Sequence, residues 1–111
     1  MGRKVEICGL DTSSIKRLSA KESEELLAKI KNGDEKAREY FITANVRLVL
    51  SLVKRFDKGK VSADDLFQAG MIGLIKSVDN FDLSVGVRFS TYAVPMIIGE
   101  LKRVMRSTNG L

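Results

Sequence analysis

Apolar residues recur every three or four positions in the stretches between the few residues that interrupt secondary structure. A spacing of three to four places side chains on one face of an α-helix, whereas a half-buried strand requires strict alternation. The chain of 111 residues contains one proline, Pro95, and nine glycines, and no alternation extends over a useful length. The sequence therefore predicts an all-α fold, a compact four-helix domain with a flexible N-terminal arm.

Capping and turn residues divide the chain into the four expected helices. Ser19 and Glu22 match the capping-box pattern, and Ser62 and Ser90 are further candidate N-caps. Pro95 is expected to cause a mild kink in the last helix. The helices are expected over residues 20 to about 32, 34 to about 56, 63 to about 80 and 91 to about 107.

Residues 1–17 mix charged and small residues and form the expected flexible arm, which leaves residues 18–108 as the folded domain. The N-terminus lacks the apolar stretch of a signal peptide, and apolar runs such as Leu48-Val49-Leu50 are too short to span a bilayer. The single cysteine, Cys8, fits a reducing compartment, so we expect a cytoplasmic protein.

The residue inventory argues against most catalytic chemistry. The chain has no histidine and one cysteine, so it can form neither a Ser-His-Asp nor a Cys-His arrangement, nor a zinc finger. Asp64 and Asp65 are adjacent and point about 100° apart on a helix, unlike paired catalytic carboxylates. Asp79 and Asp82 lack the further ligands that a cation needs. We expect no enzyme activity, no cofactor and no metal.

Charge is distributed unevenly along the chain. Nineteen Lys and Arg residues oppose fourteen Asp and Glu residues, which gives a net charge of +5. Residues 61–85 contain one Lys and four Asp, a net charge of −3, whereas residues 86–111 contain four Lys and Arg and one Glu, a net charge of +3. Residues 1–33 and 34–60 carry net charges of +2 and +3, so the chain is polarised and not uniformly basic, and its positive balance suggests a polyanionic partner.

The third expected helix has more apolar surface than one neighbouring helix can cover. Its main apolar face comprises Phe67, Gly70, Met71, Leu74 and Val78. Gln68, Ile72 and Ile75 lie on an adjoining face beside Asp64 and Asp65, so the apolar arc spans roughly 200°. Either this helix is central and wrapped by the other three, or it presents an interaction surface with an acidic rim.

Two glycines, Gly70 and Gly73, lie in the middle of the same helix. Glycine in a helix interior is unfavourable relative to alanine unless something approaches the backbone closely. The spacing predicts such an approach but leaves open whether the other backbone belongs to this chain or to a partner.

The fourth expected helix carries a stripe that differs from an ordinary solvated face. The stripe consists of Tyr92, Met96, Gly99, Arg103 and Arg106. Lys102 lies alongside it, and Arg88 and Phe89 extend the same edge. Aromatic rings interleaved with cations suit single-stranded nucleic acid, because bases stack on the ring while cations neutralise phosphates. The alternative is a surface helix whose tyrosine covers the core and whose arginines are solvated.

Three strings, in this order and spacing, resemble region two of bacterial sigma factors. They are Asn45-Val46-Arg47-Leu48-Val49, Asp64-Asp65-Leu66-Phe67-Gln68-Ala69-Gly70-Met71-Ile72-Gly73-Leu74 and Phe89-Ser90-Thr91-Tyr92-Ala93. The resemblance covers about residues 19–106 and implies the fold of sigma regions 1.2 and 2. The family continues beyond the length of this chain into regions 3 and 4, so we expect a fragment without those regions.

Two further strings are similar to those of the sporulation sigma factors that act in the forespore. They are Lys4-Val5-Glu6-Ile7-Cys8-Gly9 with Asp11-Thr12-Ser13, and Phe89-Ser90-Thr91-Tyr92-Ala93-Val94-Pro95-Met96-Ile97-Ile98-Gly99-Glu100. Pro95 and Met96 stand where primary sigma factors have two tryptophans. The resemblance therefore implies weaker promoter melting and a greater dependence on promoter sequence.

The resemblance implies two binding surfaces. The first would meet the clamp helices of the β′ subunit of core RNA polymerase. The resemblance places it at Asp65, Gln68, Met71, Ile72 and Ile75, and the acidic charge of the same helix end adds Asp64. The second would melt promoter DNA, with Tyr92 stacking on a base flipped from the non-template strand of the minus-ten element. It comprises Phe89, Tyr92, Met96, Lys102 and Arg103, to which the basic stripe adds Arg88 and Arg106.

Sporulation sigma factors resemble one another in being held by anti-sigma factors. Asn45 is a candidate contact for such a partner, and an internal hydrogen bond between helices is the alternative. The expected function is transcription initiation specific to the forespore, with the chemistry left to the polymerase. A helical adaptor whose basic stripe binds an acidic partner, such as an anti-sigma factor, remains the alternative to DNA binding.

Overall fold

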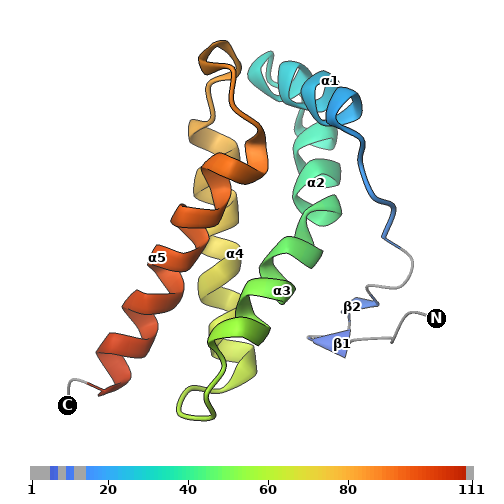
Figure 1. Cartoon of the computed structure of the whole chain (residues 1–111). Coiled ribbons are helices and arrows are strands. Elements are labelled where there is room, and N and C mark those ends of the chain that lie inside the picture. The colour runs from blue at the N-terminus through green and yellow to red at the C-terminus, as the bar shows by residue number, and fades with distance from the viewer. Residues whose placement is uncertain (1–5, 8–9, 12–14, 110–111) are drawn as a thin grey trace.

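The computed structural model describes residues 6–7, 10–11 and 15–109, and Figure 1 shows its elements. The helices are α1 (Ala20–Lys31), α2 (Glu35–Ala44), α3 (Val46–Phe56), α4 (Ala63–Asn80) and α5 (Phe89–Asn109). A 3₁₀ turn, η2 (Leu83–Val85), precedes α5. In Figure 1, α4 and α5 run side by side, α2 and α3 flank them, and α1 lies across one end. The expected all-α class is confirmed.

The N-terminal segment contains a short strand pair that the sequence does not predict. β1 (Glu6–Ile7) and β2 (Leu10–Asp11) are antiparallel, with Glu6 opposite Asp11 and Ile7 opposite Leu10. Most of the arm expected over residues 1–17 lies outside the described residues, and its flexibility stays a prediction.

The N-caps expected for the first and third helices are confirmed. At α1, the Ser19 hydroxyl accepts from the Glu22 N–H at 3.1 Å, and the Glu22 carboxylate accepts from the Ser19 N–H at 2.9 Å. At α4, the Ser62 hydroxyl accepts from the Asp65 N–H at 3.0 Å. These bonds satisfy first-turn N–H groups that have no partner within the helix.

The expected continuous helix over residues 34–56 is wrong, because Asn45 divides it into α2 and α3. Asn45 has φ −100° and ψ 8°, outside the helical range. Its side-chain Nδ2 donates to the Phe41 carbonyl oxygen at 2.9 Å, and its own carbonyl accepts from the Leu48 N–H at 3.1 Å. A side chain that bonds to the preceding turn competes with the regular helical ladder. The chain therefore changes direction between α2 and α3, as Figure 1 shows.

The last helix begins earlier than expected. α5 starts at Phe89, so Ser90 lies inside the helix and is not its N-cap. The ring of Phe89 contacts those of Phe41 and Phe81, with centroids 4.8 and 5.5 Å apart. Packing of Phe89 in the core therefore fixes the start of the helix in place of a serine cap. The helix includes Pro95, and the kink expected there stays a prediction.

The centre of the domain is the contact of α4 with α3 and α5. A Cβ on Gly73 would lie 2.6 Å from the Ile97 Cα, and one on Gly70 would lie 2.7 Å from a methyl carbon of Val49. The close approach predicted at these glycines is therefore internal. It offsets the roughly 0.5–1 kcal/mol that a helical glycine costs relative to alanine. No helix in the described ranges combines the length and apolar character needed to cross a bilayer.

Candidate functional site

One side of α4 is covered by its neighbours, and the other side is open. The buried residues of α4 are Leu66, Phe67, Ala69, Gly70, Gly73, Leu74, Ser77 and Val78. Of the six predicted docking residues, Asp64, Asp65, Gln68 and Ile72 are exposed, and Met71 and Ile75 are half-buried at the border. The structure thus places all six on the open side or its edge. The helix is central, as one alternative predicted, and it still has an uncovered face; that this face is an interaction surface stays a prediction.

The uncovered face of α4 has an apolar centre and an acidic end. Ile72 is 49% exposed and is bordered by the half-buried Met71 and Ile75, so the three side chains form a continuous apolar area. Asp64 and Asp65 lie in the first turn, where carboxylates interact favourably with the positive end of the helix dipole. The face therefore combines apolar area that water solvates poorly with a rim that attracts cations.

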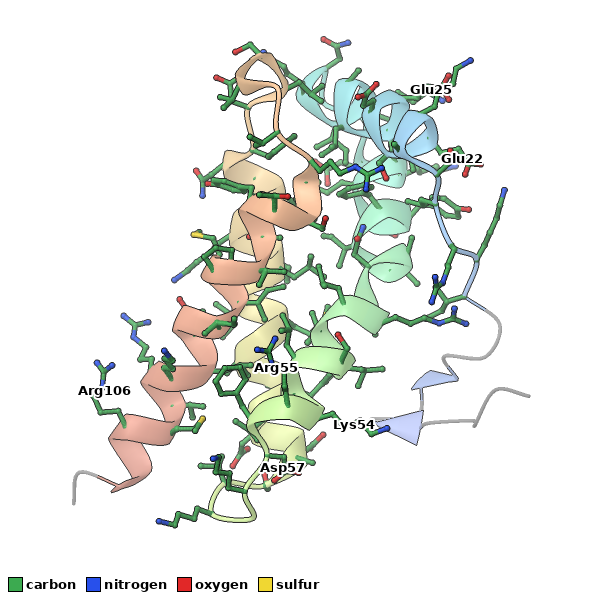
Figure 2. The ribbon with its side chains drawn as sticks, viewed as in Figure 1. Glu22, Glu25, Lys54, Arg55, Asp57 and Arg106 are labelled. Carbon is green, nitrogen blue, oxygen red and sulfur yellow. The ribbon has the colours of Figure 1, made fainter. Side chains whose placement is uncertain are left out.

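The residues on and next to α5 that are predicted to bind nucleic acid differ in how far their side chains are exposed. Arg88, Lys102, Arg103 and Arg106 are exposed, whereas Tyr92 and Met96 are half-buried. Figure 2 shows Arg106 pointing away from the bundle near the end of α5. The cations and the tyrosine are brought together along one helix, as the stripe predicts.

Phe89 does not belong to this surface, and its assignment there is corrected. Its side chain is 7% exposed. Steps of four residues from Phe89 lead to Ala93, Ile97 and Leu101, all fully buried. This spacing marks the inward face of the helix and was the available signal in the sequence.

The ring of Tyr92 rests against an aromatic cluster that the sequence does not predict. Phe81, from the segment after α4, lies 5.5 Å from Tyr92 between ring centroids, with the planes tilted by 57°. Phe81 in turn contacts Phe89. The half-buried ring of Phe81 restricts the tyrosine, so the Tyr92 ring is held in place with part of its surface accessible.

Glu100 connects the two faces and is absent from the predicted sites. Its carboxylate accepts from Lys76 Nζ at 2.9 Å and lies 3.5 Å from Arg103 Nη1. The Glu100 side chain is 17% exposed, whereas that of Arg103 is 74% exposed. An acidic group thus lies beside the basic stripe and links it to α4.

Asn45 is half-buried and makes the bond to Phe41 described above. The alternative to a partner contact was an internal hydrogen bond between two helices. The observed bond is internal, but it joins Asn45 to the turn before it and not to another helix. Asn45 also lines a cavity of about 310 Å³ between α1 and the start of α5. Glu24, Arg88 and Ser90 line the same cavity and give it polar groups of both charges.

The acidic residues Asp79, in the last turn of α4, and Asp82, just after the helix, are bonded to neighbours within the chain. Arg38 donates to both carboxylate oxygens of Asp79, at 2.9 and 3.0 Å, and this pairing raises the pKa of Arg38. The Ser84 hydroxyl and N–H donate to Asp82 and lower its pKa. Within the described ranges, no three Asp, Glu, Cys or His side chains gather as a metal site would require.

Comparison with known proteins gives the family. The model of the sigma-70 region 2 family matches residues 41–110. The RNA polymerase sigma-G factor of Clostridium acetobutylicum is 59% identical over 108 residues, 97% of this chain and 42% of that protein. The RNA polymerase sigma-G factor of Bacillus subtilis is 54% identical over 107 residues, 96% of this chain and 41% of that protein.

A sigma-F relative matches a shorter part of the chain. The RNA polymerase sigma-F factor of Bacillus licheniformis is 58% identical over 90 residues, 81% of this chain and 35% of that protein. The predicted resemblance to sporulation sigma factors is therefore confirmed, with the sigma-G relatives matching more of the chain. The chain spans about two fifths of the length of the two sigma-G relatives. By its match over residues 41–110, the chain belongs to the sigma-70 region 2 family.

Proposed function

We propose that this chain is the part of a sporulation sigma factor that binds core RNA polymerase through α4 and captures promoter DNA on α5. The observation that carries the proposal is the presence of two uncovered faces of different chemistry on adjacent helices. The face of α4 is apolar and acidic, and that of α5 is basic with an aromatic ring. Partners that differ in kind are needed to complement the two faces.

The docking step uses the exposed side of α4. Burial of Ile72, with Met71 and Ile75 at its border, supplies the apolar centre of an interface, and Gln68 supplies a hydrogen bond. Asp64 and Asp65 form a rim that suits basic side chains. The proposed partner surface is the clamp helices of the β′ subunit.

The DNA step uses α5 and the residue before it. Arg88, Lys102, Arg103 and Arg106 neutralise phosphates, and Tyr92 provides a ring on which an unpaired base stacks. The proposed ligand is the non-template strand of the minus-ten element. A flipped base requires a receiving pocket, and the polar cavity at the start of α5 lies next to this stripe.

Met96 and Pro95 adjust how readily the duplex opens. Pro95 is exposed and Met96 is half-buried, and because neither side chain is aromatic, neither offers a broad ring next to Tyr92. Less aromatic surface means less compensation for the cost of unstacking a base pair. Promoter melting is therefore weak and depends strongly on promoter sequence.

We infer the regulation and location of the protein from its resemblance to the sporulation sigma factors. The proposed site of action is the forespore, and an anti-sigma factor that contacts Asn45 holds the protein inactive. Asn45 lines a cavity that a partner side chain can enter, which supports this contact. A helical adaptor that binds an acidic protein through α5 is not favoured, because the match to the sigma-70 region 2 family extends over both faces.

The test of the DNA step uses this chain bound to core RNA polymerase. A pool of single-stranded DNA with a randomised hexamer is selected on the wild-type complex, and the affinity of the selected strand is measured by fluorescence anisotropy. Tyr92→Ala is expected to weaken binding by at least about fivefold, the loss of one stacked base. Tyr92→Phe keeps the ring and binds like the wild type. Equal binding by Tyr92→Ala and the wild type would contradict the proposal.

A further inference from the structure

Three glycines lie inside the long helices, and internal packing explains two of them. Gly70 and Gly73 face Val49 and Ile97 at distances that exclude a side chain. Gly99 in α5 differs, because a Cβ built there would meet no atom within 4 Å and the residue is exposed. Its φ is not in the left-handed range, so the backbone conformation does not require glycine either. Nothing within the described part of the fold accounts for Gly99.

Gly99 lies in the middle of the proposed DNA surface. One turn before it are Met96 and the exposed Pro95, and one turn after it are Lys102 and Arg103, both exposed. Residues three and four apart on a helix are neighbours on its surface. The turn at Gly99 is therefore a bare section of backbone between the apolar half and the cationic half of the stripe.

We propose that Gly99 is the point at which the bound DNA strand approaches α5 most closely. The inference rests on the proposed function of α5 and specifies how the strand lies on it. With no side chain at position 99, the sugar–phosphate chain passes directly over the helix backbone. A base on one side then reaches Tyr92, while phosphates on the other side reach Lys102 and Arg103. A side chain at this position holds the strand away from both groups.

A glycine on an ordinary solvated face makes a different prediction. There, alanine would stabilise the helix by its higher propensity and leave binding unchanged. At a close-approach site, the same substitution stabilises the free protein and weakens DNA binding. The opposite signs of the two effects separate a role in binding from a role in folding.

The test compares Gly99→Ala and Gly99→Leu with the wild type. Thermal unfolding is measured on the free chain, and affinity for the selected single strand is measured on the chain bound to core RNA polymerase. Gly99→Ala is expected to raise Tm by several degrees, within about 4–8 °C. Gly99→Leu is expected to weaken strand binding by at least about fivefold, with Gly99→Ala between Gly99→Leu and the wild type.

Matched controls are Thr43→Ala and Thr43→Leu at an exposed position of α2. Threonine also has a lower helix propensity than alanine or leucine, so both controls raise Tm, and both are expected to leave strand affinity unchanged. A raised Tm with unchanged affinity in both Gly99 variants would overturn the inference. A lowered Tm in Gly99→Ala would also overturn it, because the fold itself would then require the glycine.

Comparison of the Tyr92 and Gly99 variants also distinguishes failure of this inference from failure of the proposed function. If Tyr92→Ala weakens binding and the Gly99 variants do not, the inference fails and the DNA surface stands. If the wild-type complex selects no strand, or if Tyr92→Ala binds as tightly as the wild type, the DNA surface fails and the inference fails with it.

Discussion

Lys76 Nζ donates a hydrogen bond to the carboxylate of Glu100 at 2.9 Å, and this bond joins the outer edge of α4 to α5. The same carboxylate lies 3.5 Å from Arg103, a member of the basic stripe. The surfaces proposed to bind polymerase and DNA are therefore linked by one acidic group. Glu100 is also the single acid among residues 86–111.

Replacement of Glu100 by glutamine is expected to strengthen DNA binding. A carboxylate beside the stripe repels phosphates, and its loss leaves Lys76 and Arg103 available to them. Because both cations are exposed, Lys76 to 47% and Arg103 to 74%, the loss of unfolding free energy is expected to stay below about 1 kcal/mol. The slope of log affinity against log salt should steepen by up to about 0.7 for a single strand.

Salt titrations by fluorescence anisotropy measure this change on the complex with core RNA polymerase. Glu39→Gln, at an exposed position of α2, removes the same charge away from α5 and serves as the control. Weaker binding by Glu100→Gln would mean that the carboxylate holds Arg103 in a binding position instead of opposing the phosphates.

Phe89 and Tyr92 are expected to separate folding from binding. Phe89→Ala removes a 7% exposed ring that contacts Phe41 and Phe81, so it should cost about 3–5 kcal/mol of unfolding free energy. Tyr92→Ala removes a half-buried ring and should cost clearly less. Urea denaturation followed by circular dichroism measures both. Similar losses for the two variants would argue that Tyr92 is a core residue and not a stacking platform.

Alanine at the two internal glycines of α4 is expected to have unequal effects. At Gly73 the new Cβ meets backbone atoms of Ile97 and Met96, which cannot move without shifting α5. We expect a loss of about 1–3 kcal/mol for Gly73→Ala. At Gly70 the close neighbour is a side-chain methyl carbon of Val49 and not a backbone atom, and a side chain can shift without moving a whole helix, so Gly70→Ala should lose less. Chemical denaturation of the two variants gives the order, and the reverse order would contradict this packing.

Acid is expected to loosen the start of α1. The pKa of Glu22 lies below its ordinary 4.5, chiefly because its carboxylate accepts from the Ser19 N–H, with Lys16 adding a second bond. A lowered pKa in the folded state means that the contribution to stability is present above the ordinary pKa and is lost as the pH falls through the folded value. Stability should therefore fall below about pH 4.5.

An NMR titration of the Glu22 side chain checks this prediction. Lys16→Ala should raise the pKa only in part, because the bond from Ser19 remains. A Glu22 carboxyl group that titrates at or above 4.5 would show that the capping box is not formed in solution.

The helices and the open face of α4 follow from local signals in the sequence. The serine caps and the spacing of apolar residues fix α1 and α4. The same spacing separates the buried side, such as Leu74, from the open side, such as Ile72. Periodicity therefore locates a surface, although it does not say whether a surplus apolar face is covered within the chain.

The differences from the sequence prediction arise from contacts that periodicity does not encode. Asn45 ends one helix because its side-chain hydrogen bond to the Phe41 carbonyl competes with the backbone hydrogen bonds that would continue the helix. Phe89 leaves the predicted DNA surface because aromatic neighbours from two other segments receive its ring. The pair formed by Lys76 and Glu100 depends on how α4 and α5 align along each other, which residue spacing within one helix cannot give.

The central claim is tested most directly by co-purification of this chain with core RNA polymerase. The Gln68→Ala, Ile72→Ala double variant removes an anchor and apolar area from the open face of α4, and both positions are exposed, so it should keep its helicity. Glu39→Ala with Thr43→Ala is a matched exposed pair on α2. We expect the polymerase to retain the wild type and the α2 pair and to lose the α4 pair. Equal retention of all three folded proteins would contradict docking through α4.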